Sequence, residues 1–574
     1  MDWIGKDAVI HHDQDVPFQL LDWLPGLAGN SSVGGNIVVR GDNLIALRSL
    51  LPYLAKRVKC IFIDPPYNTG TEKWIYNDAV NSPEIRRWLG QVVGPVGEDL
   101  TRHDKWLCMM YPRLRLLREF LSDDGVIFVT IDENEAGHLA NLMDEIFLER
   151  NRIGILTWVR KKKGSHLSGT MRKMTDFVFA YAKEIQDTSL FGEPAYSDKL
   201  QPLVKRTNAS KTLTFPANLI VARKNGSARG GLGDGKYAPG IRGEGGTAVE
   251  FLDELVIEGG IVTCAFRARA NFVWTQEKLD EEITLGTKVT LSNEFGFNAL
   301  RWNQAEKFKR PRTLLDEDAN VDDSEVAREE LLDVLGTKLG IGTNEDASRE
   351  LSEILGVEQG QAFPYPKPVS LIHYLVRAAT KTDPTAIVLD SFAGSGTTGH
   401  AVLKLNSEDG GTRRFVLVEL EPHIFENVTV PRLRNVMSGY STRSGQHVPG
   451  LGGSINCATL GERLLTEDGD LNSKVSREQL AQYVYYLETR RSITRPISSD
   501  EYLDTADGVA YYLCSPRPGS KGERLVLDLD SLGMLREEAT SHVVYAEACH
   551  LDGRLLKSRG ITFRQLPYDF LVNH

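Results

Sequence analysis

The sequence predicts an α/β fold built on an open sheet, and two observations carry this prediction. Short apolar runs typical of buried strands alternate with amphipathic stretches typical of helices. Three of these runs also stop at a carboxylate, and in open α/β sheets ligands bind at the carboxyl ends of the strands. We expect strands at Cys60–Asp64, Val126–Ile131, Asp176–Ala182, Ala386–Asp390 and Phe415–Glu419.

Helices are expected between these strands. A helix over Leu44–Leu54 has Asp42 or Asn43 as its N-cap, because such side chains accept hydrogen bonds from the first-turn N–H groups. Residues 132–135 are expected to cap a helix that runs to about Phe147. Further predicted features are helices at 105–121 and 369–379, a turn at 123–125 that ends the first of these, and a loop over 68–100 with a helix near 84–89.

Length and composition bound the class of protein. The chain has 574 residues, which predicts two to four domains. Its net charge of -11 excludes a polycation, so any nucleic-acid surface must be local. Its 6 cysteines form no C-x-x-C pair, so neither a zinc site nor a disulfide framework is indicated. No signal peptide and no apolar run of about 18 residues is visible, so we expect a cytoplasmic protein without a membrane segment.

Shifts in composition predict the domain boundaries. Residues 190–360 hold glycine clusters and polar stretches, which indicate an inserted domain of mixed structure. We expect a loosely structured lead-in at 1–35, the two halves of the sheet domain at 36–189 and 361–430, the insert at 190–360, and a small α/β domain at 431–574 for dimer or partner contacts.

The tetrapeptide Asp64-Pro65-Pro66-Tyr67 ends the first predicted strand. The prolines lack an N–H and have a fixed φ, so their carbonyls are held in place beside a carboxylate. Asp64 and the Pro65 carbonyl are two acceptors, which suit a group with two N–H bonds such as an exocyclic amine. Tyr67 offers a face on which a base can stack. The alternative is a strand followed by a proline turn, with Asp64 capping a helix.

A glycine-rich turn follows the strand Ala386–Asp390. Gly394, Gly396 and Gly399 spell G-x-G-x-x-G, which lets a ligand approach the backbone closely. Glu419, at the end of the next strand, is placed to accept hydrogen bonds from ribose hydroxyls. No Lys-Ser/Thr pair follows the glycines, which excludes a P-loop. The turn by itself fits NAD, FAD, S-adenosylmethionine (AdoMet) or no ligand, and the double acceptor of the first motif favours methyl transfer to an amine over hydride transfer.

With both motifs in place, the sequence resembles the amino-methylating DNA methyltransferases. Asp64–Tyr67 matches the catalytic motif of that family and Phe392–Thr398 matches its AdoMet loop. The catalytic motif comes first, which is the order of the beta class. The resemblance implies a circularly permuted Rossmann-like sheet, with the insert at 190–360 as a target-recognition domain. Other similar segments are Gly125–Glu135, Asp176–Lys183 and Tyr365–Pro368.

The resemblance also implies roles for individual residues. A target base turned out of the duplex stacks on Tyr67, while Asp64 and the Pro65 carbonyl accept its amino hydrogens. Lys367 lies in the element that borders the methionine end of AdoMet, and no metal is expected. The implied catalytic residues are Asp64, Pro65, Pro66 and Tyr67, and the implied AdoMet-binding residues are Asp390, Phe392, Gly394, Gly396, Thr397, Glu419 and Lys367.

The most basic segment of the chain lies between Arg150 and Lys173. Glycine and serine separate its charges, so the segment is typical of a flexible phosphate clamp on DNA. The alternative is a solvated surface loop. The residues expected to contact DNA are Arg160, Lys161, Lys162, Lys163, Arg172 and Lys173.

The length of the chain and its ending at Ile561–Pro567 are similar to those of the modification subunit of type III restriction-modification systems. This resemblance implies a homodimer and a helicase-nuclease restriction subunit as partner. In the family, an aspartate in the first place of the motif goes mainly with N6 of adenine. N4 of cytosine, an RNA or protein substrate, and a catalytically silent DNA-binding subunit are the alternatives.

Overall fold

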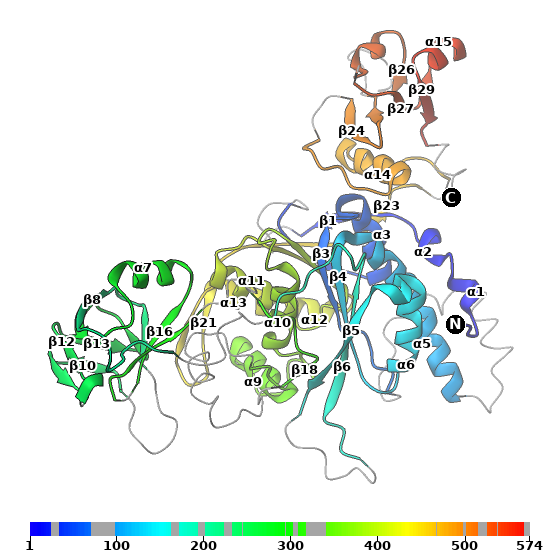
Figure 1. Ribbon diagram of the computed structural model, residues 1–574. Helices are drawn as coiled ribbons and strands as arrows, with labels where there is room; N and C mark the ends of the chain where they lie inside the picture. Colours follow the sequence, from blue (N-terminus) through cyan, green and yellow to red (C-terminus); the bar gives the residue numbers. More distant parts are fainter. Residues whose placement is uncertain are drawn as a thin grey trace. The chain divides into compact units, whose positions relative to one another are not determined.

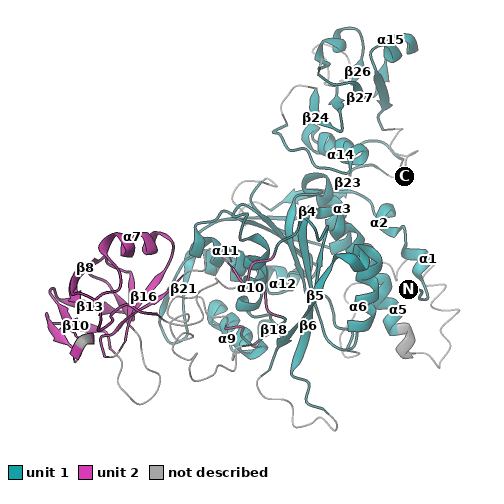
Figure 2. Ribbon diagram, viewed as in Figure 1, with its two compact units in different colours: residues 1–189, 313–315, 342–574 teal, residues 190–312, 316–341 magenta. Residues whose placement is uncertain are grey.

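The computed structural model describes the chain as two compact units (Figure 2). The first comprises Met1–Ser189, Thr313–Leu315 and Gly342–His574, and the second comprises Leu190–Arg312 and Asp316–Ile341. The residues described are 1–24, 34–69, 98–161, 171–192, 201–222, 232–243, 245–292, 294–301, 308–316, 340–466, 468–497, 501–514, 525–536 and 538–567. Most of the loop expected at 68–100, with its helix near 84–89, lies outside them.

A ten-stranded sheet forms the centre of the first unit. Its five middle strands run parallel, so their carboxyl ends lie along one edge. In spatial order they are β2 (Asn36–Arg40), β20 (Arg414–Glu419), β19 (Ile387–Asp390), β3 (Val58–Ile63) and β4 (Leu121–Ile131). The α/β fold and its predicted strands are thereby confirmed.

The sheet continues beyond this parallel centre on both sides. Next to β4 lies β6, which is antiparallel to it, followed by β5 and the short β18. Next to β2 lies β23, which is parallel to it, followed by β1 at the edge. The bounds are β6 (Thr175–Ala182), β5 (Arg152–Val159), β18 (Leu314–Leu315), β23 (Ile455–Arg463) and β1 (Gln19–Trp23).

Helices cover both faces of this sheet (Figure 1). One face carries α3 (Asn43–Leu54), α5 (Glu98–Phe120) and α6 (Ala136–Met143), and the other carries α10 (Val369–Thr380) and α11 (Thr397–Asp409). The Asp42 side chain accepts hydrogen bonds from the backbone N–H of the second and third residues of α3, which confirms the predicted N-cap. After α6 the chain continues helically to Leu148 through one π-helical turn.

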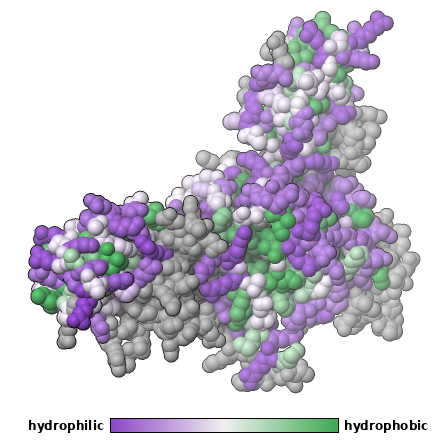
Figure 3. Space-filling view, viewed as in Figure 1, coloured by the Kyte–Doolittle hydropathy of each residue, from purple (hydrophilic) through white to green (hydrophobic). Residues whose placement is uncertain are grey.

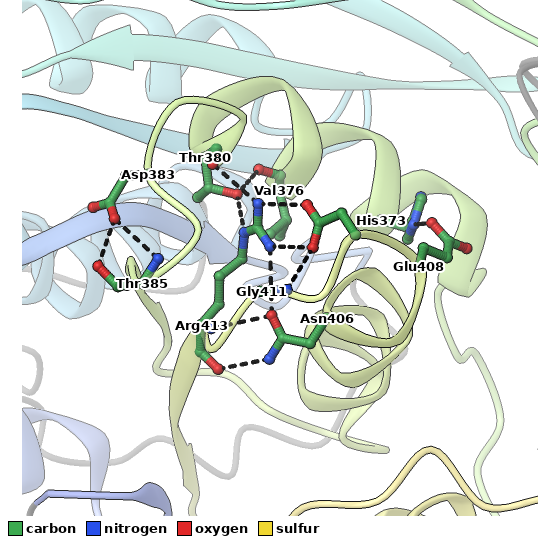
Figure 4. A network of polar contacts seen from close by, with 10 residues as sticks. His373, Val376, Thr380, Asp383, Thr385, Asn406, Glu408, Gly411 and Arg413 are labelled. Atoms are coloured by element: carbon green, nitrogen blue, oxygen red, sulfur yellow. Dashed lines mark hydrogen bonds and ion pairs between the residues drawn. The ribbon is translucent and has the colours of Figure 1, made fainter.

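Buried Arg413, directly before β20, joins the C-terminal ends of α10 and α11 (Figure 4). Its guanidinium donates to both carboxylate oxygens of Asp409, each at 2.9 Å, and its Nε donates to the Thr380 hydroxyl at 2.7 Å. A buried guanidinium needs such partners because an unpaired charge in the core is costly. The network therefore fixes these two helix ends to each other near the amino end of β20, the strand that carries Glu419.

The N-terminal lead-in is not loosely structured throughout. α1 (Lys6–Val9) and α2 (His12–Asp15) precede β1, which pairs antiparallel with β23 and so extends the main sheet. Leu20 and Leu21 are both buried. The expectation of a loose lead-in was wrong here because β1 is too short for a recognisable pattern and is stabilised by a strand more than 400 residues away in the sequence.

The turn expected at 123–125 is also wrong. The polar run lies inside β4, where the pairing with β3 shifts register between the partners of Leu121 and Val126. This irregularity is a bulge, which accommodates extra residues without ending a strand. The ammonium of Lys59 in β3 forms an ion pair with Asp124, so a charge from the neighbouring strand holds the bulge.

The chain after residue 430 contributes to both the main sheet and a smaller one. α13 (Val430–Ser438) and β23 belong with the main sheet, so the sheet does not end at the expected boundary. A four-stranded sheet packs with α14 (Arg477–Thr489), whose Tyr486 donates to Glu119 of α5 at 2.7 Å. The small sheet contains β24 (Tyr502–Ala506), β25 (Val509–Leu513), β27 (Ser541–Ala546) and β29 (Ile561–Gln565).

The second unit has its own core, with stacked rings of Phe215, Phe266 and Phe297. Among the described residues of this unit, α7 (Gln276–Thr284) accompanies a seven-stranded and a four-stranded sheet. The larger sheet contains β7 (Gln201–Pro202), β9 (Ile220–Ala222), β10 (Gly235–Tyr237), β13 (Leu255–Glu258), β14 (Ile261–Val262), β16 (Lys288–Leu291) and β17 (Phe297–Leu300), and the smaller contains β8 (Lys211–Phe215), β11 (Gly240–Arg242), β12 (Val249–Phe251) and β15 (Phe266–Ala270).

Hydrophilic residues occupy much of the described surface in the view of Figure 3. Among the described residues, no helix combines the length and the apolar composition that a membrane span requires.

Candidate active site

Three carboxylates come together where neighbouring parallel strands end. Asp64 follows β3, Asp390 ends β19 and Glu419 ends β20, and these strands are adjacent in the order β20, β19, β3. Parallel strands place their carboxyl ends at the same edge, which is the ligand-binding edge of an open α/β sheet. The two motifs that lie more than 300 residues apart in the sequence therefore form one site.

Asp64 uses both of its carboxylate oxygens. Oδ1 accepts a hydrogen bond from the Thr130 hydroxyl at 2.5 Å, and Oδ2 accepts one from the Lys367 ammonium at 2.5 Å. The Asp64 side chain is 23% exposed and Lys367 is 8% exposed. A carboxylate has about four lone-pair positions, so Asp64 can still accept a hydrogen from a ligand amine.

The Lys367 ammonium also faces two aromatic rings. It lies 4.9 Å from the ring centroid of Tyr67 and 6.0 Å from that of Trp158. Both distances fall in the range of cation–π contacts. Burial, together with the charges of Asp64 and Asp176, raises the pKa of Tyr67 well above its usual value, so its hydroxyl stays protonated.

The backbone of the tetrapeptide is held from α5 and from the turn before α6. Trp106 Nε1 donates to the Pro66 carbonyl at 2.7 Å. Asn68 has a φ of 54°, in the left-handed region that asparagine tolerates better than most residues, and its side-chain amide donates to buried Glu135. These contacts fix the direction in which Asp64 and Tyr67 project.

Glu135 also joins two histidines. His103 Nδ1 lies 2.6 Å from one carboxylate oxygen and His138 Nδ1 lies 2.9 Å from the other. These three side chains are of the types that ligate metals. Distances of 2.6 and 2.9 Å are those of hydrogen bonds, and the Asn68 amide also binds this carboxylate. The three side chains therefore fit a hydrogen-bonded group better than a metal centre. The absence of a metal stays a prediction.

The glycine-rich turn is shaped by the two other carboxylates. Asp390 accepts from the backbone N–H of Phe392 at 2.9 Å and from the Thr398 hydroxyl at 2.5 Å. Glu419 accepts from the N–H of Gly394 at 2.8 Å. Gly394 and Gly396 have positive φ values of 50° and 77°, and a Cβ at Gly394 would lie 3.1 Å from the Phe363 ring. The turn therefore requires glycine for both its conformation and its packing.

Burial raises the pKa of Asp390 to about 7 and that of Glu419 to about 7. Such perturbed carboxylates cluster at functional sites. The nearby hydroxyl of Ser391 is buried and has no hydrogen-bond partner among the described residues. A ligand with hydroxyl and amino groups could satisfy these acceptors, so the residues at this edge fit AdoMet.

A match to a known family shows to which family this chain belongs. The model of a family described as DNA methylase matches residues 58–430, which is more than half of the chain and spans both motifs. This chain belongs to the DNA methylase family. The expected resemblance is confirmed.

Several curated relatives carry the name of a modification subunit. The chain is 29% identical over 456 residues to the type III restriction-modification enzyme StyLTI Mod subunit of Salmonella typhimurium, covering 77% of this chain and 60% of that subunit. It is 28% identical to the EcoPI Mod subunit of Escherichia phage P1, covering 77% and 67%. It is also 27% identical to the type II methyltransferase M.KpnI of Klebsiella pneumoniae, covering 70% and 84%.

The chain thus spans about 60% of the length of the Salmonella subunit. Among solved structures, that of the M1.HpyAVI–SAM complex is 12% identical, with a TM-score of 0.29, and covers 69% of this chain and 98% of that chain. Assignment to the methylase family rests on the sequence match.

Sequence reasoning missed one residue that supports the glycine-rich turn of this methylase. Fully buried Arg432 of α13 donates to the hydroxyl of Ser395 at 2.9 Å and to that of Thr397 at 2.7 Å. Glu350 lies 4.0 Å from its guanidinium, and burial lowers the pKa of Arg432 to about 10. An arginine in an amphipathic helix gives no signal in the sequence that it is buried.

Thr130 and Trp106 were likewise missed as partners of the catalytic motif. Both residues lie in apolar segments that predict a strand or a helix, where a buried side chain is expected without any role in the site. Lys367 was expected on the AdoMet side, and the structure places its ammonium on Asp64.

The described members of the predicted basic set do not gather into one exposed patch. Arg160 points inward and forms an ion pair with buried Asp176 at 3.2 Å, and Lys173 pairs with Glu133. Arg172 is exposed and Lys161 is half-buried. Lys162 and Lys163 lie outside the described residues. The pairing of Arg160 favours a role in the site over direct contact with a phosphate.

Proposed function

We propose that this chain transfers the methyl group of AdoMet to the N6 amino group of adenine in DNA, as the modification subunit of a type III restriction-modification system. The observation that carries the proposal is the pair of acceptors at the end of β3, where Asp64 lies beside Tyr67 and in the same edge as Asp390 and Glu419. The names of the Salmonella and phage P1 relatives support the type III assignment.

In this proposal the catalytic motif holds an amine. Asp64 and the Pro65 carbonyl accept its two hydrogens, and Tyr67 stacks against the base that carries it. An exocyclic amine is normally conjugated with its ring. Holding both hydrogens favours a pyramidal nitrogen whose lone pair points away from the ring plane and can attack. Most of the rate acceleration comes from positioning the amine nitrogen for attack.

Asp390, Phe392, Gly394, Gly396, Thr397 and Glu419 are the residues proposed to hold AdoMet. When bound, AdoMet supplies an activated methyl group. Glu419 has the position to accept hydrogen bonds from ribose hydroxyls, while the backbone of the turn allows close approach. Arg432 keeps the turn in place from below through Ser395 and Thr397.

The proposal extends to partners and location. The second unit, which lies within the expected insert, is proposed to recognise the target sequence. The chain is proposed to form a homodimer, to bind double-stranded DNA with the target adenine turned out, and to pair with a helicase-nuclease subunit. These roles place it in the cytoplasm, where bacterial DNA lies.

The direct test is to incubate the purified chain with labelled AdoMet and unmethylated genomic DNA and to identify the labelled nucleoside. We expect N6-methyladenine. Asp64→Asn is the matched control, because it keeps the side-chain shape and removes the charge. Labelled N4-methylcytosine would show that the target base is cytosine and not adenine. If AdoMet binds but no label enters DNA, a DNA substrate for the isolated chain is contradicted.

A further inference from the structure

The ammonium of Lys367 occupies the place that the proposed function assigns to the target amine. It donates to Asp64 Oδ2 at 2.5 Å and lies over the Tyr67 ring at 4.9 Å. An adenine amino group in the same pocket would use the same carboxylate, and its base would use the same ring. One cationic nitrogen thus meets both partners that the substrate needs.

Lys367 and a stacked base exclude each other. Two stacked aromatic rings have their centroids about 4.5–7 Å apart, and the Lys367 ammonium lies within that layer on the face of Tyr67. The Lys367 side chain is 8% exposed, so contacts with the residues of the pocket determine its position. A base can reach Tyr67 on this face only after the ammonium has moved.

A second carboxylate can receive the displaced charge. Asp176 of β6 is buried, and neither of its oxygens accepts a hydrogen bond from the described residues, although Arg160 Nε lies 3.2 Å away in an ion pair. The Lys367 ammonium lies 6.0 Å from the ring centroid of Trp158, and Trp158 is the cross-strand partner of Asp176 in the pairing of β5 with β6. Burial raises the pKa of Asp176 to about 7, while the charges of Arg160 and Lys367 lower it. Asp176 therefore lies within electrostatic reach of the same ammonium.

We propose that Lys367 is a placeholder for the target amine, which fills the base pocket of the DNA-free enzyme and moves from Asp64 to Asp176 when a base is inserted. This inference rests on the proposed function and adds a specificity step to it. Only a base whose own amine replaces the ammonium on Asp64 restores a donor there. A base with a carbonyl in that place leaves Asp64 Oδ2 without a donor, and an oxygen that loses its hydrogen-bond donor in a pocket is unfavourable.

The test compares Lys367→Met with Lys367→Arg, since methionine keeps an unbranched chain without charge and arginine keeps the charge. Lys59→Met is the matched control, because Lys59 is another buried lysine paired with an aspartate, but at the bulge of β4. Adenosine is the probe, and its binding is followed by calorimetry with and without AdoMet. This readout needs neither a known recognition sequence nor methyl transfer.

We expect Lys367→Met to bind adenosine about tenfold more tightly than the wild type, because a pocket open only in a minor state weakens apparent affinity by that fraction. Lys367→Arg and Lys59→Met should give no gain. Unchanged adenosine affinity in Lys367→Met would overturn the proposal. So would a large loss of AdoMet affinity in that variant, since Lys367 would then be an AdoMet ligand.

Asp176→Asn tests the second half of the movement. Alone, it should weaken adenosine binding, because the displaced ammonium loses the negative charge that would receive it. In the Lys367→Met background it should have no further effect, and this non-additivity is the signature of coupled residues. Equal losses in both backgrounds would show that Asp176 acts only on the fold and would overturn the role given to it. A wild-type chain that binds adenosine yet methylates no DNA would contradict the proposed function and leave this inference standing.

Discussion

Glu135 accepts a hydrogen bond from the side-chain amide of Asn68, the residue directly after the catalytic tetrapeptide. The two residues lie 67 positions apart in the sequence, both are buried, and Asn68 adopts a left-handed backbone conformation there. Because the carboxylate is also shared by His103 and His138, the loop that carries Tyr67 is tied to the ends of two helices.

Replacing Glu135 by alanine should therefore lower the rate of methyl transfer more than it lowers AdoMet affinity. The change removes the carboxylate acceptor of the buried Asn68 amide, which then keeps the longer bond to the Arg102 carbonyl at 3.3 Å. A displacement of the loop by about 1 Å can cost about a hundredfold in rate. Single-turnover rates and AdoMet binding would measure the two effects. His138→Ala is the control, because His138 is 36% exposed and lies against Oε2 of Glu135, whereas Asn68 donates to Oε1. A Glu135→Ala enzyme of normal rate would contradict the positioning role.

Asp64→Ala should abolish methylation while AdoMet affinity changes little. Asp64 contacts Thr130 and Lys367, and neither bond involves the glycine-rich turn. Labelled methyl transfer and calorimetry with AdoMet give the two readouts. Thr130→Val tests the same carboxylate from its other oxygen and should lower the rate less. Full activity of Asp64→Ala would rule out the proposed mechanism.

AdoMet binding should tighten as pH rises through about 7. Burial raises the pKa of Glu419 from 4.5 to about 7 and that of Asp390 to about 7, so both carboxyls hold their protons at pH 6. A carboxylate accepts a ribose hydroxyl hydrogen more strongly than a carboxylic acid does, by an amount that corresponds to about tenfold in affinity. Titrations with AdoMet between pH 6 and 8 would measure this slope.

Glu419→Gln separates the contribution of one carboxyl. This substitution should reduce the dependence of AdoMet affinity on pH. The dependence that is left would come from Asp390 and from the ionisable groups of AdoMet. The sign for stability is opposite: a raised pKa favours the folded state at low pH, so in the absence of AdoMet these carboxyls make the free energy of unfolding fall as pH rises from about 4 to about 7. An unchanged slope in Glu419→Gln would argue against this residue as a ribose acceptor.

Arg172→Ala should weaken DNA binding equally for all sequences and flatten its salt dependence, because a phosphate contact carries no sequence information. Arg172 is exposed. Lys173→Ala should have a smaller effect, since Lys173 is already paired with Glu133. Binding to two unrelated duplexes at several salt concentrations gives the measurement. A loss confined to one duplex would indicate base recognition instead of a phosphate contact.

The sequence by itself determined five strands of the main sheet and the two motifs. Asp64-Pro65-Pro66-Tyr67 and the glycines at 394 and 396 are recognisable because each works through the backbone of a few consecutive residues. The N-cap at Asp42 was predictable for the same reason, as its acceptor and donors lie within three residues. Features that depend only on neighbouring residues can therefore be predicted from the sequence.

Only the tertiary structure decided how the charges of the site are balanced. Lys367 lies 303 residues from Asp64, and Arg160 meets Asp176 across two antiparallel strands. The buried support from Glu135 and Arg432 is equally remote from the residues that it holds. A buried charge needs a partner of opposite sign or a hydrogen bond, but it can be satisfied by any segment that folding brings near. The spacing of residues in the sequence therefore does not predict which segment supplies the partner of a buried charge.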